Sequence, residues 1–186
     1  SRTASWWPTP QKANPTPPTG FRFFVIHRMV SYWHAKTWRR EEQARFWGQR
    51  GIHYHQFLKA GENTLNLKLV RILIESLIER GGYDSDDYVQ RYISFMTTPA
   101  THRDTYVEEY HRHFFTLYAK GSPLKKCGVR EKHIGGLVGI PPIVIFYGKT
   151  PDIARRAALE HLALTHLGEK MTLSAKLLVD LLLDTL

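Results

Sequence analysis

The sequence predicts an all-α domain with a proline-rich N-terminal tail. From residue 61 onward, apolar residues recur three or four positions apart in successive segments, which is the period of helices that bury a face. No strand-like alternation of apolar and polar residues follows residue 53. The chain has 186 residues and is 42% hydrophobic, so we expect one buried core and no second domain.

The first fifty-two residues differ in composition from the rest. Residues 1–20 contain five prolines and predict a disordered or extended lead-in. Residues 21–52 are basic and aromatic. Positions 1–60 hold ten Lys or Arg and two Asp or Glu, a net charge of +8, whereas residues 61–186 hold sixteen and fifteen, a net charge of +1. Such a segment could bind nucleic acid, but it matches no known binding module, so a solvated helix face is favoured.

Residues 53–82 predict a loop with two histidines and then a long helix. The stretch "GENT", residues 61–64, precedes this helix and has two interpretations. Its side chains could cap the helix, or its oxygen atoms could hold a hard metal ion or a phosphate site. Capping is the more common role. Apolar residues fill most of residues 65–80, so we expect a helix buried on most sides that ends at Gly81 and Gly82.

Five further helices are predicted from capping and stop signals. Asp84 with Asp87 caps the first of them, and Thr105 with Glu108 forms a capping box for the second, which stops at Gly121. Pro141 or Pro142 suits the first turn of the third, and Thr150 with Pro151 begins the fourth, which stops at Gly168. The fifth begins at residue 172 and has no stop signal.

The single cysteine, Cys127, excludes an internal disulfide framework and favours a reducing compartment. The neighbouring cation of Lys126 could lower the pKa of this thiol, although no base partner is identifiable. The N-terminal stretch is polar and has no signal-peptide pattern, and no apolar run is long enough to span a membrane. We therefore expect a soluble, cytoplasmic protein.

The histidines and glycines allow more than one role. The pairs at residues 53 and 55 and at residues 111 and 113 lack the third ligand of a catalytic zinc, which favours core or surface histidines. The glycines at residues 135, 136 and 139 could let a phosphate approach main-chain amides, or they could permit close helix packing. Both interpretations of the glycines stay open.

The order of these segments resembles the ADP-ribosylglycohydrolase family over roughly residues 53–186. The stretch "LIESLIERGGYDSDDYVQRYISFM" is similar to that family's long helix, double-glycine stop and acidic-capped second helix. "GLVGIPPIVIFYG" and "DIARRAALEHLALTH" are similar to its phosphate-loop helix and to the helix that ends in a Thr-His pair, here Thr165 and His166. The resemblance implies an all-helical fold, two magnesium ions that hold ADP-ribose, and a water that cleaves the glycosidic bond.

The resemblance also implies the ligands. Gly61, Glu62 and Asn63 stand in place of the family's Thr-Asp-Asp motif, which makes Glu62 and Asn63 the expected metal ligands with one negative charge fewer. The family's Gly-Asn-Gly-Ala-Ala-Met-Arg loop is replaced by residues 133–139, without its Asn and Arg. The expected ligand-binding residues are His102, Arg103, Asp104, Gly135, Gly136, Gly139 and His166.

Two motifs of the family have no counterpart, namely its Asp-rich C-terminal metal motif and its N-terminal catalytic carboxylate. No catalytic residue is therefore assigned, and we expect the helical domain of residues 53–186 to be C-terminally incomplete. The resemblance implies metal-assisted hydrolysis of the N- or O-glycosidic bond of ADP-ribosylated substrates, with ADP-ribose or ADP-ribosylated protein as partner. The alternatives are a non-catalytic ADP-ribose-binding or crystallin-like structural relative and a basic nucleic-acid-binding protein. An exposed apolar face would favour a homodimer.

Overall fold

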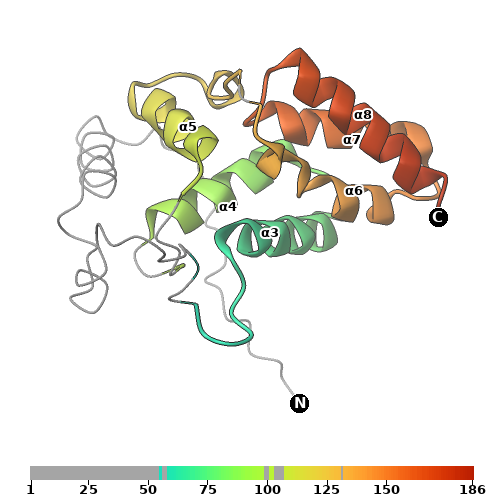
Figure 1. Ribbon diagram of the computed structural model, residues 1–186, viewed down its shortest axis with the longest axis horizontal. Coiled ribbons are helices and arrows are strands. Elements are labelled where there is room, and N and C mark those ends of the chain that lie inside the picture. The colour runs from blue at the N-terminus through green and yellow to red at the C-terminus, as the bar shows by residue number, and fades with distance from the viewer. Residues whose placement is uncertain (1–54, 56–57, 99–100, 103–106, 131) are drawn as a thin grey trace.

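The computed structural model in Figure 1 describes residues 55, 58–98, 101–102, 107–130 and 132–186. These residues form six α-helices and two short 3-10 helices, in the order α3 (Leu65–Arg80), α4 (Ser85–Thr97), α5 (Glu109–Ala119), η1 (Leu124–Lys126), η2 (Ile134–Leu137), α6 (Ile140–Phe146), α7 (Pro151–Ala163) and α8 (Glu169–Leu183). The described part of the chain contains no strand, and Val129 and His166 form an isolated parallel bridge. The predicted all-α class is confirmed. The predicted tail and basic segment, residues 1–52, lie outside the described residues.

One group of three helices forms a large part of the fold. Helices α6, α7 and α8 pack against one another, and α3 packs against α4 and α6. Figure 1 shows these three helices gathered on one side of the molecule and α5 on the other. The core between the elements is built from fully buried side chains, the largest of which include Leu73, Leu77, Phe114, Phe115, Ile140, Ile143, Val144 and Leu162.

The junction of α3 and α4 forms as its sequence predicts. Gly81 adopts a left-handed conformation with φ of 67°, which a residue without a Cβ adopts without strain, and it ends α3. The Asp84 side chain then accepts hydrogen bonds from the main-chain N–H groups of Asp86 and Asp87 and caps α4. The carboxylate of Asp87 joins the two helices, because it accepts hydrogen bonds from Ser76 and Arg80 as well as from Arg91.

Helix α3 is less buried than its composition predicts. Leu67, Ile74 and Ile78 are exposed, whereas the residues that face α4 and α6 are buried. The expectation of burial on most sides is therefore wrong. Among the described elements α3 packs closely against these two helices, so its opposite face stays in solvent.

Two predicted helix boundaries are also wrong. Helix α5 begins at Glu109, so Glu108 precedes the helix and is not the third residue of a capping box. Thr105 lies outside the described residues. Helix α7 ends at Ala163, and Gly168, which was expected to end α7, is instead the residue that precedes α8. The physical reason is the bridge, since the main chain at residues 165–167 turns out of the helix to hydrogen-bond with Val129.

Candidate functional site

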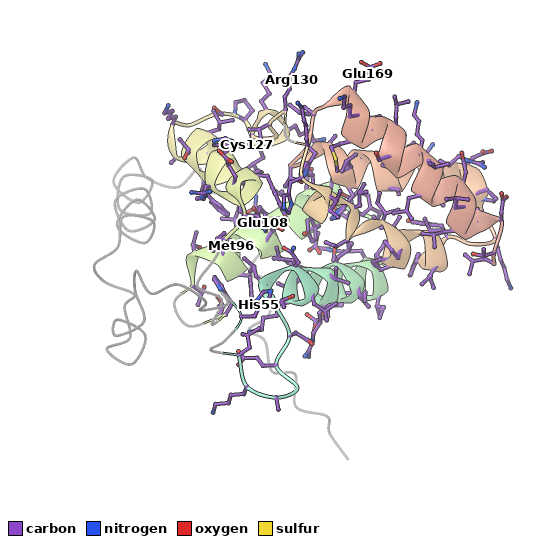
Figure 2. The ribbon with its side chains drawn as sticks, viewed as in Figure 1. His55, Met96, Glu108, Cys127, Arg130 and Glu169 are labelled. Carbon is purple, nitrogen blue, oxygen red and sulfur yellow. The ribbon has the colours of Figure 1, made fainter. Side chains whose placement is uncertain are left out.

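Polar side chains from four parts of the chain meet around Glu108. This residue stands immediately before α5, which fixes its position beside the first turn of α3 and the 3-10 helix η2 (Figure 2). Its Oε2 accepts a hydrogen bond of 3.1 Å from Nδ2 of Asn66, a residue of α3 that is 42 positions away in the sequence. Its Oε1 lies 3.3 Å from Nδ1 of His133. The Glu108 side chain is 14% exposed, so this carboxylate is accessible to solvent in part.

The ring nitrogen Nδ1 of His133 has two alternative partners. It accepts a hydrogen bond of 3.2 Å from the main-chain N–H of Gly135, and it also lies next to the Glu108 carboxylate. An imidazole nitrogen with a free lone pair accepts, and a protonated one donates, so the same atom cannot serve both partners at once.

The buried imidazole of His111 lies behind Glu108. Burial lowers the pKa of His111 to about 3, with a smaller contribution from the positive charges that His166 and His102 would carry. Burial likewise raises the pKa of Tyr92 well above its usual range, so its hydroxyl keeps its proton. This hydroxyl lies 2.7 Å from Nδ1 of His111 and forms a hydrogen bond with it; where the hydroxyl is the donor, the imidazole proton is on Nε2.

Nε2 of His111 has no hydrogen-bond partner among the described residues, and Oε2 of Glu108 lies 4.0 Å from it. That distance is too long for a direct hydrogen bond. A small cavity of about 30 Å³ lies beside the ring of His111, and its lining includes Asn66, Tyr110, His111, Gly135, Gly136 and Thr165. This volume suits a water molecule, whereas a drug-sized ligand usually needs a pocket of about 300–1,000 Å³.

The three glycines predicted to bind phosphate lie against side chains. A Cβ on Gly135 would come within 2.6 Å of an oxygen of Glu108. A Cβ on Gly136 would meet the ring of His166, and one on Gly139 would meet the ring of His161. Close packing thus accounts for all three glycines. Phosphate binding at their main-chain amides stays a prediction.

His166 belongs to the same cluster, as its sequence position suggested. It is buried in the turn between α7 and α8, its Nδ1 lies 2.9 Å from Oγ1 of Thr165, and its ring centroid lies 4.5 Å from that of Tyr110. His102 is also buried and packs beside Phe95, with ring centroids 6.1 Å apart. Arg103 and Asp104 lie outside the described residues.

The predicted metal ligands Glu62 and Asn63 stand just before α3. Oε1 of Glu62 is 3.1 Å from Nζ of Lys68, and Oε2 accepts a hydrogen bond of 3.2 Å from the main-chain N–H of Lys59. The carboxylate that would bind magnesium is thus already neutralised by an ammonium group. Within the described ranges, no group of three or more His, Cys, Asp or Glu residues could hold a metal ion. A magnesium ion would have to displace this ammonium group before it could bind Glu62, and the two ligands stay a prediction.

The other interpretation of residues 61–64 is that their side chains cap α3. Thr64 is the residue that precedes α3, but its side chain makes no capping hydrogen bond. Glu62 instead ties the loop to α3 through Lys68.

The prediction of a lowered pKa for Cys127 is wrong. The side chain is buried, and burial raises the pKa of the thiol to about 11. Its Sγ donates to the main-chain carbonyls of Ser122 and Pro123, so the neighbouring lysines do not set its chemistry. His113 and Glu109 form the exposed helical pair that their spacing predicts, at 3.5 Å.

Sequence reasoning missed most of this cluster. Asn66, Glu108, Tyr110 and His133 carried no recognised motif, and Glu108 was assigned to a helix cap. The sequence shows Glu108 only as an acidic residue directly before an aromatic-rich helix. Many solvent-exposed carboxylates stand in the same kind of position, so this pattern does not indicate a site.

The architecture and the cluster together define an all-helical protein with a polar site between helix ends. A family model described as ADP-ribosylglycohydrolase matches residues 27–184, and the chain belongs to this family. The match begins before residue 53, from which the resemblance was drawn, and includes most of the basic segment. No curated protein and no solved structure matches the chain. None of the helices in the described ranges is long and apolar enough to cross a membrane.

Proposed function

We propose that this protein binds the ADP-ribosyl group and hydrolyses the N- or O-glycosidic bond that joins it to a substrate. Membership of the ADP-ribosylglycohydrolase family supports the substrate class. The observation that carries the proposal is the partly exposed carboxylate of Glu108, held by Asn66 beside the imidazole of His111. ADP-ribose and ADP-ribosylated proteins are the expected partners, and the single buried cysteine supports a cytoplasmic location.

The chemistry required is the delivery of a water molecule to an anomeric carbon. A carboxylate within hydrogen-bond reach of that water can orient it and take its proton. Oε2 of Glu108 and the Nε2–H of His111 are 4.0 Å apart and can bind one water between them, the first as acceptor and the second as donor. In this proposal the Tyr92 hydroxyl donates to Nδ1 of His111, which puts the imidazole proton on Nε2, and burial keeps the ring neutral. His111 is thus assigned to water orientation and Glu108 to proton abstraction.

Magnesium at Glu62 and Asn63 is part of the same proposal. When bound, the ion would polarise the ribosyl or phosphate oxygens of the substrate. Lys68 must leave Glu62 before a cation can bind there. His102, Arg103, Asp104, His166 and the three glycines remain the proposed ligand contacts.

A non-catalytic relative is the second candidate. The cavity beside His111 is too small for an ADP-ribosyl group, and the ammonium group of Lys68 is paired with the Glu62 carboxylate that magnesium would use. Both observations favour a protein that keeps the fold of the family without its turnover.

One experiment separates the two candidates. ADP-ribose and magnesium are titrated by calorimetry, and release of ADP-ribose from ADP-ribosylated protein is measured, with the wild type and with Glu108→Gln. The first candidate predicts binding by both proteins and a loss of turnover of roughly a hundredfold or more in Glu108→Gln, as expected for a lost general base. Glu169→Gln, an exposed carboxylate in the first turn of α8, is the matched control and should keep full activity (Figure 2).

Two outcomes would contradict hydrolysis. The wild type could fold without turning over the substrate, which leaves the non-catalytic candidate, or Glu108→Gln could retain full activity, which removes Glu108 from the mechanism. For the metal, Lys68→Met should bind magnesium more tightly than the wild type, because the competing ammonium is gone. Equal binding by the two proteins would exclude Glu62 as a ligand.

A further inference from the structure

The outer face of α8 exposes three leucines in one row. Leu173, Leu177 and Leu181 are 57%, 62% and 55% exposed, respectively. On the opposite face, Met171, Ala175 and Val179 are buried. The helix therefore packs on α6 and α7 with one face and presents a second apolar face to solvent. In Figure 1 this helix forms the upper right edge of the molecule.

The spacing of the leucines suits contact with another helix. They are separated by four positions, so they form a continuous ridge along the helix, and ridges of this kind interdigitate in the most common class of helix packing. A contiguous exposed apolar row of this kind marks an interaction surface more often than an isolated leucine does.

Two residues of opposite charge stand at equal distances from the two ends of the leucine row. Lys170 stands three positions before Leu173, and Asp184 stands three positions after Leu181. Both are exposed, and neither makes an ion pair within the described part of the chain. Asp180, on the same face, is already held by Arg155 at 2.8 Å. The five residues are therefore spaced symmetrically about Leu177, with a positive charge at one end of the row and a negative charge at the other.

We propose that α8 docks on α8 of a second copy of this chain, antiparallel, about a two-fold axis at Leu177. In this register Leu177 meets its own counterpart, Leu173 meets Leu181 of the partner subunit, and Lys170 meets Asp184 of the partner subunit. Every contact occurs twice, as a two-fold interface requires. A parallel arrangement would place Lys170 against Lys170 of the partner subunit, so charge repulsion selects the antiparallel one. This interface is independent of the proposed hydrolysis.

The first test measures the mass of the full chain by sedimentation over a concentration series. The wild type should dimerise, and Leu177→Asp should weaken the dimer roughly thirtyfold or more, because it places two carboxylates at the centre of the apolar contact. Leu67→Asp is the matched control, since Leu67 is an exposed leucine on α3, and it should dimerise like the wild type. Far-UV circular dichroism checks that each variant is folded. A monomeric wild type at about 100 μM, or a dimer broken by Leu67→Asp and not by Leu177→Asp, would overturn the proposal.

The second test examines the register. Lys170→Glu and Asp184→Lys should each weaken the dimer, and the double variant should restore it, because the ion pairs are re-formed with exchanged charges. Leu177→Cys should form an intermolecular disulfide under mild oxidation, whereas Leu173→Cys should not, because only residue 177 lies on the axis. The one native cysteine, Cys127, is buried and does not compete. No recovery in the double variant, or cross-linking at residue 173 in preference to 177, would exclude this register.

Discussion

His111 and His161 are buried in the same helical domain, and both are neutral at physiological pH. Burial lowers their pKa values to about 3 and about 4, respectively. Each ring has a tyrosine hydroxyl beside it, Tyr92 at 2.7 Å from His111 and Tyr83 at 3.3 Å from His161. Gly139 lies against the ring of His161, and Gly135 lies against the Glu108 carboxylate, whose Oε2 is 4.0 Å from Nε2 of His111.

The stability of the protein should therefore decrease as the pH is lowered from 6.5 to 4. Between pH 6.5 and pH 4 the unfolded chain binds protons at both histidines and the folded protein does not, so the free energy of unfolding rises with pH. The slope is at most about 1.4 kcal/mol per pH unit for each histidine. Denaturation by urea at pH 7, 6 and 5 measures it. Asp87, whose ordinary pKa is 3.8 and whose pKa in the protein is lower, contributes below this window.

His111→Gln should make this dependence shallower, because one of the two proton-binding sites of the unfolded chain is removed. His113→Gln serves as the control for a histidine substitution at an exposed position of the same helix. An unchanged slope in His111→Gln would show that His111 is protonated in the folded protein, contrary to its burial.

At the scale of the element, the helix ends show which signals act locally. Asp84 and Gly81 act through hydrogen bonds and dihedral angles within a few residues, so the sequence was sufficient to predict them. The end of α7 was not predictable in the same way, because Val129 decides it from outside the helix. The position of Glu108 in the site could not be predicted for the same reason, because its hydrogen-bond partner Asn66 belongs to another helix.

Two N-terminal residues of helices allow a direct comparison. Asp84→Ala should lower the free energy of unfolding by about 1 kcal/mol, because two main-chain N–H groups lose their acceptor. Thr64→Ala should change it by much less, because the Thr64 side chain makes no capping bond at the start of α3. Urea denaturation of both variants gives the difference. Equal losses would mean that Thr64 does cap α3 in solution.

At the scale of the whole molecule, the sequence predicted the helical class and the family but not the site. Helical periodicity and family motifs are properties of short segments, whereas the cluster around Glu108 needs α3, α5 and η2 to be packed together. The contact between Glu62 and Lys68 is a further case, because residue types alone suggested a metal ligand and the fold supplies an internal cation.

The packing of the helices predicts where the structure opens first. Helices α6, α7 and α8 contact one another, and their amides should exchange with solvent only on global unfolding. Helix α5 is attached mainly through the buried rings of Phe114 and Phe115, and its amides should exchange sooner. Hydrogen exchange followed by mass spectrometry resolves these segments. Faster exchange in α7 than in α5 would contradict this order.

The bridge between Val129 and His166 brings together the two ends of the segment that contains η2, α6 and α7. A segment whose ends meet can be exchanged alone only where few contacts cross its boundary. Here α6 packs on α3 and α8, α7 packs on α8, and Ile140, Ile143 and Leu162 are fully buried. Recombination therefore has to keep this segment together with α3 and α8, and the glycine-rich side of the site stays joined to the side that carries Asn66.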